Sequence, residues 1–226
     1  KYIYLWLFIL NSMQITWYGH SCFLIQNEQT KIIIDPFDER SVGLKRPDAT
    51  ADIVLMSHDH YDHNASNSID GAHEDHMAHN GGFNSHGIDF LGLDTYHDHE
   101  LGAKRGHNTM YLFRLDGISI CHCGDRGCIP SEEVLKEIAG VDILMIPIGG
   151  YYTLELDEVM ELIDIVNPSV VIPMHYRIGG LKIDEISDLD PFIRSVSKRT
   201  IVNIGKTIDI NKDEMPVDKE IWVFDN

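Results

Sequence analysis

The sequence predicts an α+β fold in which two β-sheets pack face to face and helices cover their outer sides. Short segments rich in β-branched and aromatic residues, typical of strands, dominate the first part of the chain. Helical segments with apolar residues at three- and four-residue spacing alternate with strands in the second part. These two blocks suit stacked sheets flanked by helices, and 226 residues without a visible linker or internal repeat suit one domain.

The strands of the first block follow from apolar runs separated by turn residues. Asn27-Glu28-Gln29 forms a polar break between two of the runs, and Asp116-Gly117 is a strong hairpin signal. The first three runs therefore predict a meander, and the last two predict a hairpin. The predicted strands are 14–18, 21–26, 31–34, 52–56, 109–115 and 118–122.

Two helices are predicted between later strands. Ser131 can cap a short helix that ends at Gly140. A second helix carries apolar residues at helical spacing from Leu156 to Val166 and stops before Pro168. The strands on either side of this second helix are expected to be parallel. The remaining predicted elements are strands at 142–146, 170–174, 200–204, 207–210 and 220–224 and a helix around 190–198.

The most informative motif is His58-Asp59-His60-Tyr61-Asp62-His63, which directly follows the apolar run 53–56. In an extended backbone alternate residues point the same way, so His58 and His60 can bind one ion. Asp62 and His63 can turn toward a second ion if the chain then enters a helix. Imidazole and carboxylate ligands suit zinc, and also manganese or iron. The alternative, a polar surface loop, requires the strand-end position and the spacing to be coincidental.

Three further segments carry ligand-type residues, and two of them follow short apolar runs. Two ions about 3.5–4 Å apart can share a hydroxide and stabilise the oxygens of a reacting ester, amide or phosphate, so hydrolysis is the expected chemistry. Cys121 and Cys123 are an alternative thiolate site, but strand alternation places both sulfurs opposite His122, which favours packing. The three segments are Thr95-Tyr96-His97-Asp98, Cys121-His122-Cys123-Gly124-Asp125 and Val171-Ile172-Pro173-Met174-His175-Tyr176.

Together these motifs resemble the metallo-β-lactamase-fold hydrolases, and within them the small metal-dependent hydrolases related to ascorbate-phosphate lactonase. The resemblance implies a four-layer αββα sandwich with metals at one edge, formed by residues 13–226 after an apolar N-terminal extension at 1–12. The stretches that carry it are Ile15-Thr16-Trp17-Tyr18-Gly19-His20-Ser21, Asp35-Pro36, His58 to His63, Arg105-Gly106-His107-Asn108-Thr109, Gly124-Asp125, Pro147-Ile148-Gly149-Gly150-Tyr151-Tyr152-Thr153 and Pro173-Met174-His175-Tyr176.

The resemblance also implies a role for each matching ligand-type residue. Asp125 would bridge two divalent ions, most often Zn²⁺ with Mn²⁺ or Fe²⁺ as alternatives, and would orient the nucleophile. Asp35 would orient a ligand histidine without touching metal. The remaining ligands would be His58, His60 and His97 for the first ion and Asp62, His63 and His175 for the second.

Several polar residues are candidates for contact with the substrate. His20 matches a position near the active site of the family, which predicts substrate contact or proton transfer; the alternative is a turn histidine. Arg105 and Asn108 can hydrogen-bond an oxyanion or a phosphate, or can tie down a loop. Tyr151 or Tyr152 can reach the pocket because the two preceding glycines allow a sharp turn.

Segment 64–96 carries four histidines among small polar residues, His73, His76, His79 and His86. Its apolar periodicity is low, so a loop or short helix over the mouth of the site is predicted. The histidines are either extra ligands or solvated loop residues. The second interpretation is favoured because the other segments already supply ligands for two ions.

Composition limits the partners and the compartment. The chain has 36 acidic and 18 basic side chains and a net charge of −18, so its field repels phosphate backbones and no nucleic-acid-binding surface is expected. A small-molecule substrate drawn to a local metal site remains open. The four cysteines lack the spacing of a disulfide framework, which suits a reducing compartment, and cytoplasmic localisation is predicted.

The N-terminus carries nine apolar residues at 2–10, too few for the roughly 20 that span a bilayer. An extension outside the catalytic fold and an export signal are the two interpretations, and the missing cleavage pattern favours the extension. No membrane association is therefore expected. The resemblance makes a homo-oligomer reasonable.

The sequence thus predicts an enzyme, a two-metal hydrolase in which a metal-bound hydroxide attacks a small ester, lactone or phosphorylated substrate. One alternative is a phosphodiesterase that acts on nucleotides or nucleic acid. Another is a metal-binding protein without turnover. Oxygen-reducing di-iron members of the superfamily have a glutamate where this chain has His60, which argues against oxygen chemistry.

Overall fold

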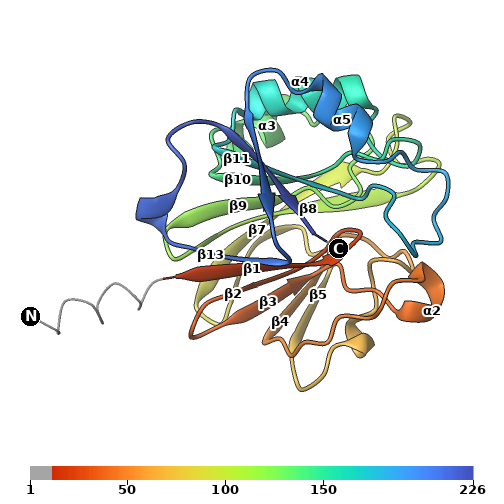
Figure 1. Cartoon of the computed structure of the whole chain (residues 1–226). Coiled ribbons are helices and arrows are strands. Elements are labelled where there is room, and N and C mark those ends of the chain that lie inside the picture. The colour runs from red at the N-terminus through yellow and green to blue at the C-terminus, as the bar shows by residue number, and fades with distance from the viewer. Residues whose placement is uncertain (1–11, 226) are drawn as a thin grey trace, which may run out of the picture.

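The computed structural model describes residues 12–225, which form two β-sheets packed face to face (Figure 1). Both sheets are mixed, with antiparallel and parallel neighbours. The six-stranded sheet has the order β13 (Thr207–Ile210), β1 (Met13–Gly19), β2 (Cys22–Gln26), β3 (Lys31–Ile34), β4 (Ile53–Met56), β5 (Glu74–Met77). The eight-stranded sheet has the order β12 (Thr200–Ile204), β14 (Glu220–Phe224), β11 (Val170–Met174), β10 (Ile143–Pro147), β9 (Ile118–His122), β8 (His107–Leu115), β7 (Ile88–Tyr96), β6 (Gly81–Ser85).

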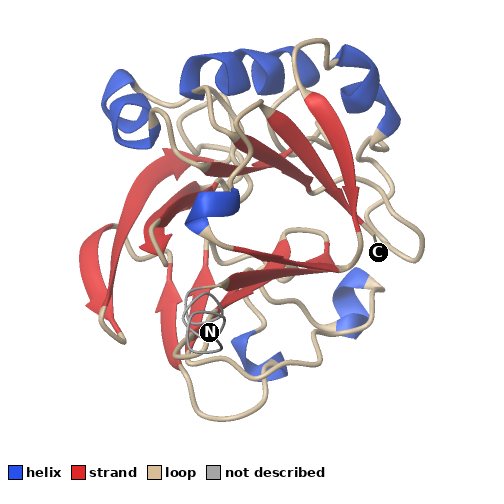
Figure 2. Ribbon diagram, turned by 60° about the vertical axis from the view of Figure 1, so that its left-hand side comes forward, coloured by secondary structure: helices blue, strands red, loops and turns tan. Residues whose placement is uncertain are grey.

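Helices lie on the outer sides of the two sheets, which confirms the predicted four-layer αββα sandwich (Figure 2). The outer layer of the eight-stranded sheet holds the three longer helices, whereas the layer beside the six-stranded sheet is thin. The longer helices are α3 (Glu132–Ile138), α4 (Leu156–Val166) and α5 (Asp190–Ser195). The short ones are α2 (Glu39–Val42) and the 3-10 turn η1 (Ser66–Ser68), whereas a second 3-10 turn, η2 (Lys212–Glu214), lies in the connection from β13 to β14.

The main core lies between the sheets and continues under the longer helices. Trp17 and Phe23 of the six-stranded sheet and Tyr111 and Ile120 of the eight-stranded sheet are all buried in one cluster. Strands β10 and β11 are buried at every position because the other sheet covers one face and helices cover the other. These apolar strands form the rigid frame from which the site residues project.

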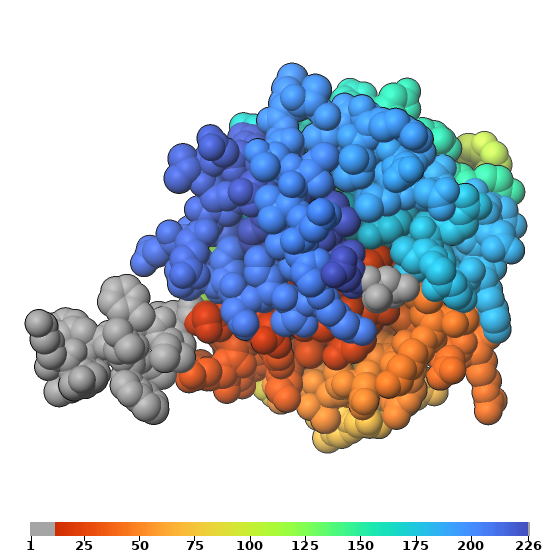
Figure 3. Space-filling model, viewed as in Figure 1, coloured from red at the N-terminus to blue at the C-terminus, as the bar shows by residue number. Residues whose placement is uncertain are grey.

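A smaller core covers the outer face of the six-stranded sheet. Leu24 and Val54 pack there with Val42 of α2 and with Ile183, which belongs to the segment 177–187. Because the Lys182 amide donates to the Val42 carbonyl at 2.9 Å, this late segment is fixed against an early helix. Figure 3 shows the same contact, with residues near 180 in light blue beside residues near 40 in orange.

Most of the predicted elements are confirmed, with ends that differ by at most three residues. The meander, the hairpin at Asp116-Gly117 and the parallel pairing of β10 with β11 are present. Ser131 caps α3 through its hydroxyl, which accepts from the Val134 amide at 3.5 Å.

The proposed extension at 1–12 lies outside the described residues except for Ser12. Over the described part of the chain, no helix is long and apolar enough to cross a membrane.

The prediction for segment 64–96 is wrong. It forms β5 at the edge of one sheet, β6 at the edge of the other, and the nine-residue strand β7. The first two strands are short and largely polar, and β6 begins with two glycines, so pairing with β4 and β7 decides their conformation rather than their own apolar pattern. The segment joins the two sheets and contributes no residue to the pocket described below.

Candidate metal centre

The metal-type side chains meet at one edge of the sandwich because each of them follows a strand. His97 and His175 come directly after β7 and β11, His58 comes two residues after the end of β4, and Asp125 comes three residues after the end of β9. His20 lies in the turn between β1 and β2. Strand ends that are far apart in the sequence therefore place their polar residues in one buried cluster.

A first group of donor atoms comes from His58, His60 and His97, whose donor atoms all lie within 4.8 Å of one another. The ring centroids are 4.5 Å apart for His58 and His60 and 4.8 Å apart for His58 and His97. His58 and His97 are buried, whereas His60 is half-buried. The Nδ1 atom of His97 lies 3.1 Å from the Tyr152 carbonyl, which leaves Nε2 facing the group.

A second group consists of His20, Asp62, His63 and His175, all buried and with donor atoms within 4.8 Å. The Nε2 atom of His20 lies 3.1 Å from Asp62 Oδ2 and 3.2 Å from His63 Nε2. Burial and the neighbouring His175 lower the pKa of His20 to about 4, so its imidazole is neutral near pH 7. A neutral imidazole is the form that binds metal.

Asp125 lies between the two groups. Its Oδ2 atom is 3.3 Å from His97 Nε2 of the first group, and 3.2 Å from His63 Nε2 and 3.1 Å from His175 Nε2 of the second. Burial alone would raise the pKa of Asp125, but His175 and His63 hold it well below its usual range. This carboxylate is therefore ionised and touches both groups.

Asp35 and Ser57 hold two of the imidazoles from behind. Asp35 Oδ2 lies 2.9 Å from His63 Nδ1 and accepts from the Ser57 hydroxyl at 2.8 Å, and that hydroxyl lies 2.9 Å from His58 Nδ1. A proton on each Nδ1 atom leaves each Nε2 free for metal. Burial alone would raise the pKa of Asp35, but His63 lowers it, so the carboxylate stays charged. Asp35 thus contacts His63 and lies outside both groups of donor atoms.

An unusual backbone conformation directs three of these side chains into the site. His20, Asp35 and His175 have φ values of 53°, 49° and 50°, in the left-handed region that residues with a Cβ seldom adopt. Each costs about 1–2 kcal/mol relative to a right-handed conformation. The surrounding hydrogen bonds hold these three residues in this unfavourable backbone conformation. The strain indicates that the placement of their side chains is important for the site.

The residues fit a pair of divalent ions. His58 Nε2 and Asp125 Oδ1 are buried and have no hydrogen-bond partner within residues 12–225, which is costly for a polar atom unless a cation binds it. The donors are imidazole nitrogens and carboxylate oxygens without sulfur, a set that suits zinc, manganese or iron.

A cavity of about 410 Å³ opens onto the metal-type residues. We call its metal-type residues the floor and its remaining residues the rim. The floor consists of His60, Asp62, His97, Asp125 and His175, which line the cavity, together with the buried metal-type residues directly behind them, His20, His58 and His63. The rim consists of Tyr61, Arg105, Tyr152, Lys182, Ile183 and Glu185.

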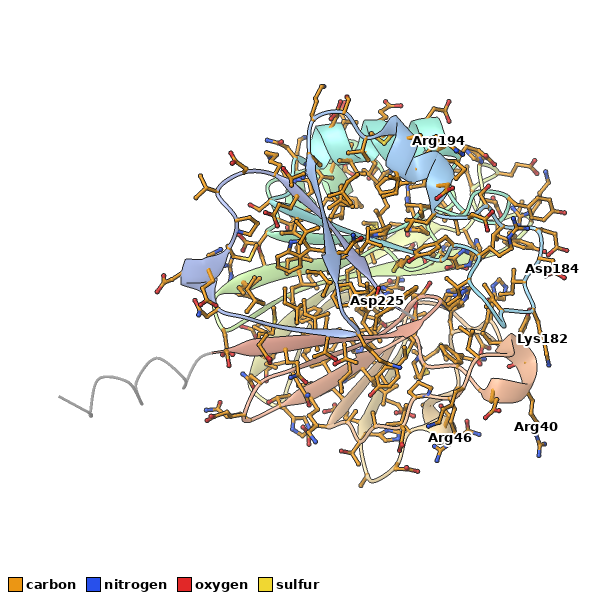
Figure 4. All side chains as sticks on the ribbon, viewed as in Figure 1. Arg40, Arg46, Lys182, Asp184, Arg194 and Asp225 are labelled. Atoms are coloured by element: carbon orange, nitrogen blue, oxygen red, sulfur yellow. The ribbon has the colours of Figure 1, made fainter. Side chains whose placement is uncertain are left out.

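The rim carries two basic residues from different segments. The guanidinium carbon of Arg105 lies 5.2 Å from the centroid of the Tyr152 ring, a cation-π contact. Lys182 donates from Nζ to the Arg40 carbonyl at 2.8 Å, and Figure 4 shows Lys182 and Arg40 on the same side of the molecule. Neither Arg105 nor Lys182 makes an ion pair with a carboxylate of the described residues.

Asp98 shapes the loop that carries Arg105. Its carboxylate accepts from the backbone amides of Glu100, Gly102, Lys104 and Arg105 at 2.7–2.9 Å. Burial raises the pKa of Asp98, but these four amides more than offset it and lower the pKa to about 2. The loop is therefore organised around one charged side chain.

Two predicted substrate contacts do not fit the structure. His20 is fully buried and does not line the cavity, so its placement agrees with a metal ligand rather than with substrate contact. Asn108 is also fully buried. Its Nδ2 donates to Thr95 Oγ1 and the Cys123 carbonyl, and its Oδ1 accepts from the Asp125 amide at 2.8 Å. With its amide fully used, Asn108 positions Asp125 and cannot contact an oxyanion.

Other predictions near the site have mixed outcomes. Cys121 and Cys123 are free, buried members of the main core, which confirms packing. Tyr152 lines the cavity, whereas Tyr151 is 57% exposed and does not. Sequence reasoning missed Lys182 and Glu185, because segment 177–187 has no motif. Tyr61 was also missed, although it lies inside the His58 to His63 motif.

Comparison with known proteins agrees with this geometry. The chain matches the beta-lactamase superfamily domain over residues 14–175. A UPF0173 metal-dependent hydrolase from Carboxydothermus hydrogenoformans is 32% identical over 192 residues, covering 73% of this chain and 85% of that protein. Another from Methanoregula boonei is 30% identical over 226 residues, covering 88% and 98%.

Solved structures share the fold. A metallo-beta-lactamase superfamily protein from Thermotoga maritima has a TM-score of 0.78 and 32% identity, covering 94% of this chain and 98% of that one. Igni18, a metallo hydrolase from Ignicoccus hospitalis, has a TM-score of 0.61 and 20% identity over 82% of this chain and 90% of its own, which supports the fold alone. Because the superfamily domain spans most of the chain and the two UPF0173 relatives, at 32% and 30% identity, cover 73% and 88% of it, the protein belongs to the UPF0173 family of metal-dependent hydrolases in the beta-lactamase superfamily.

Proposed function

We propose that this metal-dependent hydrolase uses two divalent ions to cleave a small ester or lactone that carries an anionic group such as a phosphate. Zinc is the metal that we expect. The observation that carries the proposal is the position of Asp125 Oδ2, within 3.1–3.3 Å of donors from both groups. A carboxylate oxygen in this position would be within reach of ions held by either group. The Thermotoga maritima relative carries the name of a Zn-dependent hydrolase, which supports zinc.

Each residue of the centre then has a distinct task. His58, His60 and His97 would hold one ion, and Asp62, His63 and His175 would hold the other together with His20. When bound, the two ions supply an activated water and stabilise negative charge on the substrate oxygen. Asp35 keeps the His63 and His58 rings in the tautomer that exposes Nε2, and Asn108 fixes the backbone of Asp125.

The rim supports an anionic substrate. The chain carries a net charge of −18, yet Arg105 and Lys182 both line the cavity without a carboxylate partner among the described side chains. A guanidinium can bind a phosphate or carboxylate through two parallel hydrogen bonds. The cavity of about 410 Å³ suits a small molecule, and the resemblance to ascorbate-phosphate lactonase agrees with a phosphorylated ester or lactone.

The first experiment is elemental analysis of protein purified without a chelator or histidine tag, comparing wild type with Asp125→Ala. We expect at least two ions per chain in the wild type and fewer in the variant. Asp59→Ala is the matched control, because Asp59 belongs to the same motif but is exposed and accepts only from Asn64. One ion in the wild type, or no loss in Asp125→Ala, would overturn the two-ion centre.

Turnover is tested on a panel of phosphorylated esters, lactones and phosphodiesters. The proposal expects hydrolysis of an anionic ester or lactone that disappears in His58→Ala and survives in Asp59→Ala. Faster cleavage of phosphodiesters would favour the phosphodiesterase alternative instead. Two bound ions without turnover of any substrate would favour a metal-binding protein.

A further inference from the structure

A second pair of facing imidazoles lies outside the metal centre. The Nδ1 atoms of His76 and His79 are 3.2 Å apart. His76 is in β5 and is only 8% exposed, whereas His79 is half-buried in the connection from β5 to β6. The pair therefore lies where the edge of one sheet crosses to the edge of the other, with one ring open to solvent.

The separation of the two nitrogens suits a shared metal ion. Two nitrogens bound to zinc at about 2.0–2.1 Å with tetrahedral angles lie about 3.3–3.4 Å apart. The Nε2 atoms of His20 and His63 in the metal centre are also 3.2 Å apart. The same donor type at the same spacing therefore occurs at both places.

The opposite side of His76 carries the support that such a ligand needs. Coordination through Nδ1 requires the proton to be on Nε2. This buried Nε2 has no hydrogen-bond partner within residues 12–225, and Glu74 Oε1 lies within ion-pair range of it at 3.4 Å. The other oxygen of Glu74 accepts from the Ser85 hydroxyl at 2.6 Å. A carboxylate behind a ligating histidine is a usual arrangement at protein metal sites.

Neighbouring aromatic residues fix both imidazoles. Phe83 stacks on His76 with ring centroids 4.4 Å apart and on His79 with centroids 4.2 Å apart. The Tyr111 hydroxyl accepts from the His79 amide at 3.1 Å and lies 3.1 Å from the His76 carbonyl. Because rings and backbone are already held, binding an ion requires little ordering.

We propose that His76 and His79 bind a further transition-metal ion, such as Zn²⁺, through their Nδ1 atoms, with water completing the coordination. Imidazole is a good ligand for zinc, nickel and copper, and the carboxylate of Glu74 adds negative charge. This ion has a structural role, because it ties β5 of the six-stranded sheet to the turn that leads into the eight-stranded sheet. The proposal does not depend on the number of ions in the catalytic centre.

The site is connected to the catalytic motif through β4. Met77 pairs with Met56, the last residue of that strand, and the Tyr111 hydroxyl lies 3.1 Å from the Met56 carbonyl. His58 follows two residues later. An ion at the His76–His79 pair therefore stiffens the strand end that carries the first metal ligands.

The test is a count of zinc ions by elemental analysis after saturating the chelator-treated protein with zinc and removing the excess. We expect His79→Asn to hold one ion fewer than the wild type. His86→Asn is the matched control, because His86 is exposed in the same segment and has a φ of 50°, which asparagine tolerates. This control should hold as many ions as the wild type.

A second measurement separates metal binding from simple proton sharing between the rings. Nitrogen-15 NMR of the histidine side chains should show the Nδ1 signals of His76 and His79 shifting when zinc is added. Equal ion counts in wild type and His79→Asn, or Nδ1 signals that zinc leaves unchanged, would overturn the proposal. Because the count is a difference from wild type, failure of the two-ion catalytic centre would appear separately, in Asp125→Ala.

Discussion

The floor and the rim of the cavity are built in opposite ways. Floor residues follow strands of the two sheets, are mostly buried and are braced by Asp35, Ser57 and Asn108. Rim residues come from loops and are more open, as Tyr61 with 57% exposure illustrates. This difference indicates that the two β-sheets hold the metal-type residues in place, whereas recognition of the substrate depends on loops whose sequence can vary. Substitutions in the two regions should therefore affect different measured quantities.

The largest effect should come from Asp35→Asn, a change of one atom beneath the floor. Asparagine cannot accept from His63, Ser57 and the Ser57 amide together, so the His63 ring loses its support. We expect metal affinity to fall about 10–100-fold. Competition with a coloured chelator measures it.

The control for this change is Asp142→Asn. Asp142 accepts from the amide and the hydroxyl of Ser119 just as Asp35 does from Ser57, but it lies outside the cavity. Its substitution should leave metal affinity unchanged. If Asp35→Asn bound metal as tightly as the wild type, the floor would not depend on its bracing and the comparison would fail.

A rim substitution, Arg105→Ala, should raise KM for an anionic substrate and leave kcat and metal content nearly unchanged. A hydrogen bond to a charged group at this half-buried position is worth about 1.5 kcal/mol, which corresponds to a roughly tenfold change in KM. Steady-state kinetics measures both constants. Lys104→Ala is the matched control, because the neighbouring Lys104 is exposed and pairs only with Glu100. If Arg105→Ala lost metal, the claim that rim residues act on substrate binding alone would be contradicted.

The smallest effect is expected from Asp98→Asn, which acts on the rim through its loop. One amide oxygen cannot satisfy four backbone amides, so the loop should loosen, amide exchange of Gly102 and Lys104 should speed up, and KM should rise a few-fold. Hydrogen exchange and kinetics measure these changes. Unchanged exchange would contradict the role given to Asp98.

The same carboxylate predicts a pH dependence. Its pKa is about 2 in the folded protein and 3.8 ordinarily, so its contribution to stability is complete above about pH 4 and disappears as the pH falls through 2. Loop exchange in the wild type, corrected for intrinsic rates, should therefore be constant from pH 5 to 8. A transition within that range would point to a different group.

The sequence made the floor predictable because its residues follow apolar strand-type runs. His58, Asp125 and His175 each come after such a run, and strand ends gather at one edge of a sheet. It could not place Lys182, because that residue depends on a long-range contact with Val42 that no local pattern records. Strands β5 and β6 were missed for a related reason, since their polar residues become strands only through pairing with neighbours.

Ile183 belongs to both the rim and the outer core beside the six-stranded sheet. Because Ile183 both faces the substrate cavity and packs in the core, few substitutions are tolerated at this position. A polar replacement that suited a new substrate would also remove apolar packing from Val42 and Leu181, so the gain in selectivity would come with a less stable fold. New substrate specificities should therefore arise first at Tyr61, which is exposed and belongs to neither hydrophobic core.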